Sequence, residues 1–407
     1  MHYAPSRKIV PPPLAVPSIA RGWHLLGTGT DSGHIHFPGR DRPIARYSLA
    51  HPALKRFEKA GQRLIFAAAA QLLPRGERGR APDWDARPHR VLYLRYDRIG
   101  DMIMATGLIR AIASSHPGLQ LDVLASPSNA PVLEGNPYVR RVLRFDRRRA
   151  GQIPGVLRVL RDGRYDAVID GMVMSPSVTM MLLMIATGAP HRIGIRGRKN
   201  DFVYTLPVPP AAPGAHFIEQ SRQTAIPFGV DLERTNWKPE LFLRPAEAYA
   251  AESQWEASPG TSRLLVNISA STEDRRWPAE HYVAVIREAR RLDPSVRVLV
   301  MSSPKEGPVA KLIADQAGVQ RAHAPSVRTA FALVATATAV FTPDTSVSHA
   351  AAALDVPVAV MMLSTRPEYG PYGARHVRLE SNGPTLLDLP VNQAVAGVGQ
   401  LLELAGG

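Results

Sequence analysis

The chain has 407 residues, no cysteine and a net charge of +14, from 49 Lys and Arg against 35 Asp and Glu. This length exceeds one ordinary hydrophobic core and predicts two or three domains. The lack of cysteine excludes disulfides, thiolate metal sites and cysteine nucleophiles, and it is typical of a reducing compartment. The hydrophobic content of 45% excludes wholesale disorder.

The net excess of positive charge lies in the first 245 residues. Residues 1–87 and 88–245 each carry a net charge of +8, whereas residues 246–407 carry −2. A basic surface attracts phosphate groups, either on nucleic acid or on anionic lipid. Aromatic residues, which would stack on bases, make up only 6% of the chain. We therefore expect no nucleic-acid partner.

The N-terminal segment, residues 1–87, predicts an arm that contains one helix. Residues 1–50 are rich in Pro, Gly, His and Ser without a sustained period, which indicates a loop-like extension. Apolar residues at helical spacing over 51–73, with lysines and arginines on other faces, predict a basic amphipathic helix. Such a helix either lies in a membrane interface or packs on the next domain. No apolar run of about 18 residues occurs and prolines interrupt the N-terminus, so we expect a cytoplasmic protein.

From residue 90 onward, short apolar runs alternate with helical stretches. The first series predicts strands at 91–96, 119–126, 139–145 and 165–170, and helices at 101–115, 152–162 and 176–187. The second series predicts strands at 263–269, 296–302, 339–343 and 356–362, and helices at 279–292, 306–317, 327–337, 346–354 and 386–404. Strands that alternate with helices form parallel sheets covered on both faces. We therefore predict an α/β fold with two doubly wound domains, over 88–245 and 246–407, that face a cleft.

The turn after the first predicted strand is the first candidate site. Arg95, Arg98, Gly100 and Asp101 follow this strand, where Gly100 permits a tight bend and Asp101 opens the next helix. Asp101 either caps that helix and complements its dipole, or projects into the cleft as a general base. Ligands of doubly wound sheets bind outside the carboxyl ends of the strands, which is where this turn lies.

Two turns in the second series place hydroxyl groups before a helix. Residues 267–278 form either a diphosphate cradle or a solvated loop, and residues 342–349 offer backbone amides and small side chains to an anion. His349, in the second turn, is either a buried structural histidine or a ligand. Asp83-Trp84-Asp85 has the spacing of a metal-binding pair of carboxylates, but we interpret it as a solvated loop and expect no metal.

These turns, in this order, resemble glycosyltransferase family 9, the ADP-heptose:lipopolysaccharide heptosyltransferases. The resemblance covers about residues 90–405 and rests on RYDRIGDMIMATGLIRAI (95–112), NISASTEDRRWPAEHY (267–282), PDTSVSHAAAALDVPVAVMM (343–362) and STRPEYGPYG (364–373). It implies the GT-B architecture, with two Rossmann-like domains that face a cleft. The first domain then binds the acceptor and the second binds the nucleotide sugar.

The resemblance also implies roles for individual residues. Asp101 matches a catalytic base, and Arg275 falls where the family places a cation on the diphosphate of the donor. Arg95 and Arg98 lie beside the base, on the acceptor side. The implied donor-binding residues are Ser271, Thr272, Glu306, Asp344, Thr345, Ser346, Ser348, His349 and Thr365.

The implied reaction is an inverting transfer of a heptose from a nucleotide-diphosphate donor, ADP-heptose, without a metal or another cofactor. The acceptor is a lipopolysaccharide core or a related anionic glycan, which implies peripheral contact with the cytoplasmic face of the inner membrane. Ser346 and Ser364 stand where the family usually has Gly, and a glycine there would allow a positive φ or close phosphate approach. Two alternatives therefore stay open: a family member that uses another nucleotide sugar, and a non-catalytic relative that binds nucleotide sugars or glycolipids.

Overall fold

The computed structural model describes Gly61, Ala68 and residues 79–174, 177–258, 260–365 and 368–406. The arm predicted over 1–50 lies outside the described residues. The amphipathic helix predicted over 51–73 does so too, apart from Gly61 and Ala68. All described residues belong to one compact unit, Leu54–Gly407. The domain boundaries given above stay predictions.

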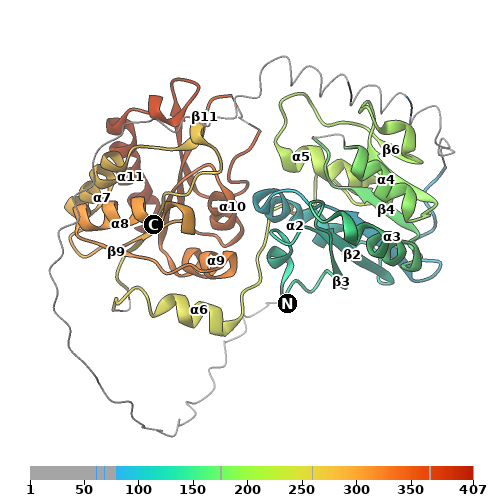
Figure 1. The fold of residues 1–407 in the computed structure, drawn as a ribbon, viewed down its shortest axis with the longest axis horizontal. Helices are drawn as coiled ribbons and strands as arrows, with labels where there is room; N and C mark the ends of the chain where they lie inside the picture. Colours follow the sequence, from blue (N-terminus) through green and yellow to red (C-terminus); the bar gives the residue numbers. More distant parts are fainter. Residues whose placement is uncertain are drawn as a thin grey trace, which may run out of the picture. The chain divides into compact units, whose positions relative to one another are not determined.

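The first sheet has six parallel strands in the order β3-β2-β1-β4-β5-β6 (Figure 1). Its strands are β1 (His89–Leu94), β2 (Leu119–Ala125), β3 (Arg141–Arg144), β4 (Ala167–Asp170), β5 (His191–Ile195) and β6 (Leu206–Val208). The helices of this half are α2 (Ile99–Ala113), α3 (Ile153–Asp162), α4 (Val178–Ala186) and α5 (Phe217–Arg222).

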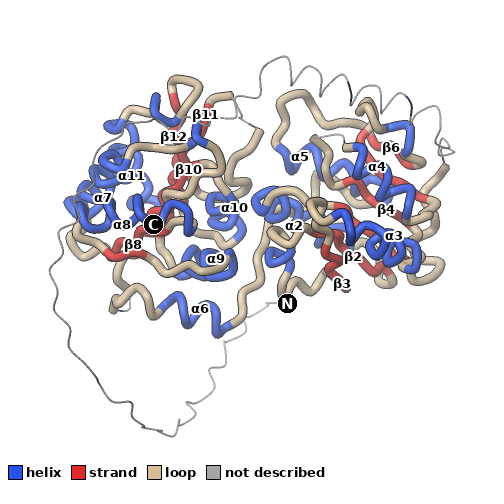
Figure 2. The backbone as a smooth tube through the Cα atoms, viewed as in Figure 1, coloured by secondary structure: helices blue, strands red, loops and turns tan. Residues whose placement is uncertain are grey.

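The second sheet is also parallel, with the order β12-β11-β10-β7-β8-β9 (Figure 2). Its strands are β7 (Arg263–Asn267), β8 (Arg297–Met301), β9 (Gln320–Arg321), β10 (Ala339–Pro343), β11 (Val358–Leu363) and β12 (His376–Ser381). The helices from this point on are α6 (Pro245–Glu252), α7 (Ala279–Leu292), α8 (Gly307–Ala317), α9 (Val327–Thr336), α10 (Ser346–Ala353) and α11 (Val391–Gly406).

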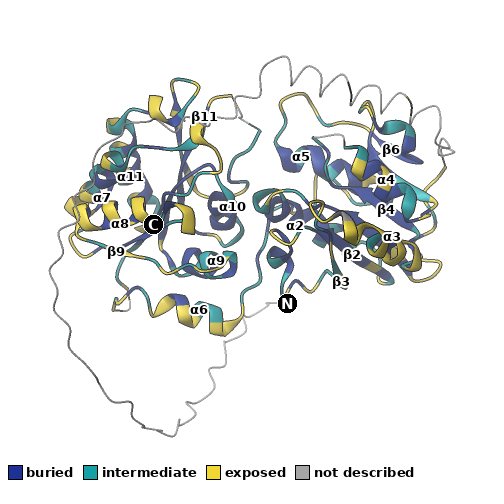
Figure 3. Cartoon of the chain, viewed as in Figure 1, coloured by how far each residue is buried: buried dark blue, intermediate teal, exposed yellow. Residues whose placement is uncertain are grey.

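The central strands are buried on both faces, as strand β1 shows. Val91 and Tyr93 pack into one core cluster, while Leu92 and Leu94 pack into another on the opposite face. Figure 3 shows strands β2 and β4 of the same sheet as largely buried. A strand covered on both sides needs a continuous apolar run, and that run is the signal from which the sequence predicted it. The predicted α/β class with two doubly wound sheets is confirmed.

Two short interpretations from the sequence were wrong in part. The helix predicted at 386–404 begins only at Val391, because Leu386–Asp388 form a separate 3-10 turn before Pro390. The loop around Asp83-Trp84-Asp85 is exposed at both carboxylates, as predicted, but not at its tryptophan. Trp84 is buried, stacks on Phe228 with ring centroids 4.6 Å apart, and donates its Nε1–H to the carbonyl of Pro227 at 2.8 Å.

Two glycines of α2 allow this helix to pack closely against other parts of the chain. A Cβ on Gly107 would lie 2.4 Å from the carbonyl oxygen of Trp237, in the segment that connects the halves. A Cβ on Gly100 would lie 2.8 Å from Cδ2 of His349, on α10, and α2 and α10 are in contact. Gly100 is not among the glycines with positive φ, so the close packing, and not a bend, requires a glycine there.

None of the helices in the described part of the chain combines the length and the apolar character needed to cross a bilayer.

Candidate functional site

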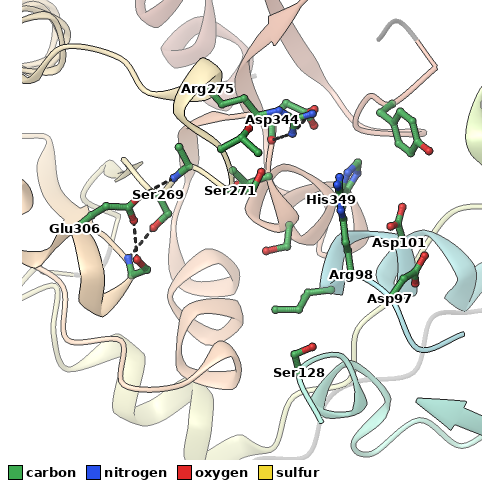
Figure 4. A pocket seen from close by; sticks show the side chains of 18 residues that line it. Asp97, Arg98, Asp101, Ser128, Ser269, Ser271, Arg275, Glu306, Asp344 and His349 are labelled. Carbon is green, nitrogen blue, oxygen red and sulfur yellow. Dashed lines mark hydrogen bonds and ion pairs between the residues drawn. The ribbon is translucent and has the colours of Figure 1, made fainter. Parts of the chain in front are cut away.

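A pocket of about 490 Å³ lies where the carboxyl ends of both sheets meet the first turns of α2 and α10. The turns after β1, β7, β8 and β10 supply its walls, as expected for parallel sheets. Figure 4 shows Asp97 and Asp101 lying together beside Arg98, apart from the pair formed by Arg275 and Asp344. The pocket therefore brings the first and second series of motifs to one place.

Asp101 lies in the first turn of α2 and lines this pocket. The residue at the N-cap is Arg98, and its side chain makes no capping hydrogen bond. Asp101 complements the helix dipole from within the turn, and its Oδ1 lies 3.4 Å from Nη2 of Arg95. Its side chain is 14% exposed, so the carboxylate keeps access to the pocket.

Asp97 is a second carboxylate that we did not single out from the sequence. Nη2 of Arg95 donates to its Oδ2 at 3.0 Å, while its Oδ1 is buried without a hydrogen-bond partner. The pKa of Asp97 is raised to about 6, mainly by burial and also by the nearby carboxylate of Asp101, against the attraction of Arg95. Arg95 thus bridges two carboxylates, one of which readily accepts a proton.

Asp97→Asn is expected to stabilise the protein at alkaline pH. Because the folded pKa lies above the unfolded value of 3.8, ionised Asp97 destabilises the fold above pH 6. This cost disappears as the pH falls from about 6 to 4. We expect the variant to gain about 3 kcal/mol in unfolding free energy at pH 8 and only about 0.5 kcal/mol at pH 4. Urea denaturation at both pH values measures this, with the exposed Asp162→Asn as a control that should show no such dependence. An equal effect of Asp97→Asn at both pH values would contradict the prediction.

Arg95 is buried beneath the carboxylates. One guanidinium nitrogen donates to the carbonyl of Gly171 after β4, and Cζ lies 4.6 Å from the ring centroid of Phe217 on α5. Arg95 and Arg98 both line a neighbouring pocket of about 640 Å³, which also contains Arg147 and Arg148. Arg95 therefore positions Asp97 and Asp101, whereas Arg98 borders both pockets.

Arg275 and Asp344 form an ion pair at one wall of the first pocket. Nη1 of Arg275 lies 2.9 Å from Oδ2 of Asp344 and donates to the backbone carbonyl of the same residue at 2.6 Å. This pair joins the turn after β7 to the turn after β10. Asp344 therefore holds Arg275 in place at the pocket wall.

The first turn of α10 contains four of the predicted donor-binding residues. Thr345 is the N-cap, and its hydroxyl accepts from the backbone N–H of Val347 at 3.3 Å. Thr345, Ser346 and His349 line the pocket, but Ser348 does not. Ser348 is buried and donates its hydroxyl to the carbonyl of Thr345 at 2.7 Å, so it braces the helix turn.

His349 is buried against Gly100, and burial lowers its pKa. The imidazole is therefore neutral at pH 7. Neither Ser346 nor Ser364 is strained. The non-glycine residues with positive φ in the described part of the chain are Arg164, Glu256 and Asp355. A left-handed conformation is thus not needed at either position, which removes the conformational reason for a glycine there.

Glu306 ties together the turns after β7 and β8. Its carboxylate accepts from the backbone N–H of Ala270 at 3.0 Å and from the hydroxyl of Ser303 at 2.7 Å. Ser271 and Thr272 line the pocket on the same wall. Thr365 is exposed and does not line this pocket. Within the described ranges, no group of three or more His, Asp or Glu side chains is arranged to hold a metal ion.

Comparison with known proteins identifies a family for this arrangement. Residues 155–388 match the model of glycosyltransferase family 9 (heptosyltransferase). Lipopolysaccharide heptosyltransferase 2 of Escherichia coli (strain K12) is 24% identical over 319 residues, which cover 71% of this chain and 88% of that protein.

Solved structures show the same fold. The family 9 glycosyltransferase of Veillonella parvula superposes with a TM-score of 0.69 at 17% identity, covering 79% of this chain and 99% of that chain. The E. coli heptosyltransferase WaaC with ADP gives a TM-score of 0.62 at 22% identity, covering 78% of this chain and 99% of that chain. The predicted GT-B architecture agrees with both.

Proposed function

The chain belongs to glycosyltransferase family 9, the heptosyltransferases, and we propose that it transfers a heptose from ADP-heptose to a lipopolysaccharide core or a related glycan. The observation that carries this proposal is the juxtaposition of Asp101, on α2, with Arg275 and the start of α10 around one pocket. A carboxylate and an anion site in the same pocket suit a reaction in which a hydroxyl group is deprotonated while a diphosphate leaves.

The proposed reaction is an inverting displacement at the anomeric carbon. Asp101 takes the proton from an acceptor hydroxyl as its oxygen forms a bond to that carbon. The bond to the diphosphate oxygen breaks on the opposite face, and the nucleoside diphosphate leaves with the electron pair. Inversion follows because attack and departure occur on opposite faces of the sugar.

The donor would lie along the second sheet. Backbone amides at the start of α10, the hydroxyls of Ser271 and Thr272, and the guanidinium of Arg275 would bind the diphosphate. Glu306, oriented by Ala270 and Ser303, would accept hydrogen bonds from the ribose. We propose a reaction without a metal because the guanidinium of Arg275 and these neutral hydrogen-bond donors would offset the charge that develops on the leaving group.

The acceptor would enter from the neighbouring pocket. Asp97, Arg98 and Asp101 line both pockets, so a glycan bound in the second can present a hydroxyl to the first. Arg147 and Arg148 suit a phosphorylated sugar. The relative from E. coli is named for lipopolysaccharide, and an acceptor of that kind would place this chain at the cytoplasmic face of the inner membrane.

A panel of nucleotide sugars tests the donor. ADP-heptose at about 100 times its dissociation constant should stabilise the protein by about 2.7 kcal/mol and raise its melting temperature. UDP-linked and GDP-linked sugars at the same concentration should leave the melting temperature unchanged. A shift with one of those instead would indicate a family member with another donor. If no nucleotide sugar raised the melting temperature and no transfer were detected, the result would favour a non-catalytic relative.

A further inference from the structure

One surface of the first half carries a large share of the positive charge of the chain. Residues 139–164 contain nine arginines and two aspartates, a net charge of +7 against +14 for the whole protein. They form the edge strand β3, the turn that follows it and helix α3. All nine arginines are exposed. We call this surface the β3–α3 face.

Most of this charge is not neutralised within the fold. Arg140 bonds to Asp122 and Arg149 pairs with Asp146 at 3.4 Å. The other seven arginines make no ion pair in the described part of the chain; they are Arg141, Arg144, Arg147, Arg148, Arg158, Arg161 and Arg164. A surface of this kind attracts a polyanion, and no internal ion pair of these seven arginines competes with it in the described part of the chain.

Helix α3 and the adjacent α4 also expose aliphatic side chains. Ile153 and Val159 of α3 are 41% and 42% exposed, and Leu182 of the adjacent α4 is 50% exposed. Only Leu160 of α3 is buried, and most of the helix is exposed in Figure 3. A groove of about 710 Å³ runs between β3 and α3, with Val142, Val156 and Val159 in its walls and Arg141, Arg144 and Arg149 among its lining residues.

We infer that the β3–α3 face docks on the surface of an anionic lipid bilayer. Arginines would bind the lipid phosphates, while Ile153, Val159 and Leu182 would enter the boundary between headgroups and acyl chains. Nucleic acid fits this face less well, because binding it favours aromatic side chains that stack on bases. Among the large exposed hydrophobic residues in the described ranges, the one aromatic residue is Tyr249, on α6.

The position of this face agrees with an acceptor held in a membrane. Asp146 lines both this groove and the neighbouring pocket of about 640 Å³, in which we propose that the acceptor binds. The adjacent Arg147 and Arg148 line that pocket too. A glycolipid that stays in the bilayer could then extend its glycan past this turn toward Asp101. The inference rests on the proposed function for the identity of the acceptor, but not for the binding of lipid.

Vesicle sedimentation of the full chain tests the inference. The double variant Arg144→Glu/Arg161→Glu is compared with Arg291→Glu/Arg297→Glu, which makes the same change in net charge at exposed positions of the second half. Each basic residue near an anionic surface strengthens binding by about fivefold. With vesicles of phosphatidylglycerol and phosphatidylcholine at 3:7, the first variant should bind at least about 25-fold more weakly, and the control within about twofold of wild type. Vesicles of pure phosphatidylcholine should bind the wild type and both double variants weakly.

Equal binding by both variants and the wild type would overturn the inference, as would a wild-type protein that does not sediment with anionic vesicles. Binding that is lost only when residues 1–78 are removed would assign the membrane contact to the N-terminal arm instead. Transfer to a soluble, deacylated acceptor should be unchanged in Arg144→Glu/Arg161→Glu. Normal lipid binding without transfer to either acceptor would contradict the proposed function and leave the inference intact.

Discussion

Asp101→Asn should slow sugar transfer at least about 100-fold while leaving the affinity for the nucleotide sugar almost unchanged. The amide keeps the size of the side chain but cannot take a proton from the acceptor hydroxyl, and removal of a general base costs a factor of this order. Asp101 lies across the pocket from Arg275 and Glu306, so the donor loses no expected contact. Steady-state kinetics at saturating acceptor, together with calorimetric titration of ADP-heptose, separate the two quantities.

The matched comparison is Asp162→Asn, an exposed aspartate at the end of α3, which should transfer at the wild-type rate. Near-normal turnover in Asp101→Asn would reject the general-base role. A parallel loss of donor affinity and turnover would instead assign Asp101 to binding, because the loss would then extend to the ground state.

Arg275→Ala should weaken the binding of ADP between about 10-fold and 100-fold. A charge-assisted hydrogen bond contributes about 1.5–3 kcal/mol, and the variant also leaves Asp344 next to the diphosphate without its counter-charge. Both changes act in the same direction, since an unpaired carboxylate repels the anion. Calorimetric titration with ADP measures the effect, and Arg275→Lys should recover part of it because the charge is restored without the planar fork.

The neighbouring Arg276 provides the control. It pairs with Glu273, its side chain is 42% exposed, and it does not line the pocket. Arg276→Ala should therefore bind ADP within about twofold of the wild type. Equal losses in the two variants would indicate a general electrostatic effect of the turn after β7, and an unchanged affinity in Arg275→Ala would remove it from the donor site.

The parts of the fold that could be predicted from sequence are those with a strong local signal. The predicted strand at 339–343 and helix at 279–292 coincide with β10 and α7, because each has an apolar pattern bounded by polar residues. Strands β5, β6 and β9 were missed, since they are short and contain Gly, Pro or only polar residues. Strand β12 was also missed, because four of its six residues are polar and only alternate ones are buried.

The site was predicted from the turns but not from the contacts between them. Asp101, Arg275 and Asp344 each follow a predicted strand, so the parallel sheet brings them to one edge. Asp97 was missed because its setting depends on Arg95, which is held by Gly171 and Phe217, more than 70 residues away in sequence. Ser348 was assigned to the donor because a sequence motif does not reveal which face of a helix turn points at a ligand.

The packing of Gly100 against His349 limits how such an enzyme can be recombined. In a chimaera that joins the first half of this chain to the second half of a relative, the residue of the relative at position 349 would face Gly100, which has no Cβ. A bulkier partner would force the helices apart at the point where both substrates must meet, and a smaller one would leave a hole. Exchange of specificity between family members would therefore require residues 100 and 349 to be transplanted as a pair, even though they belong to different halves of the chain.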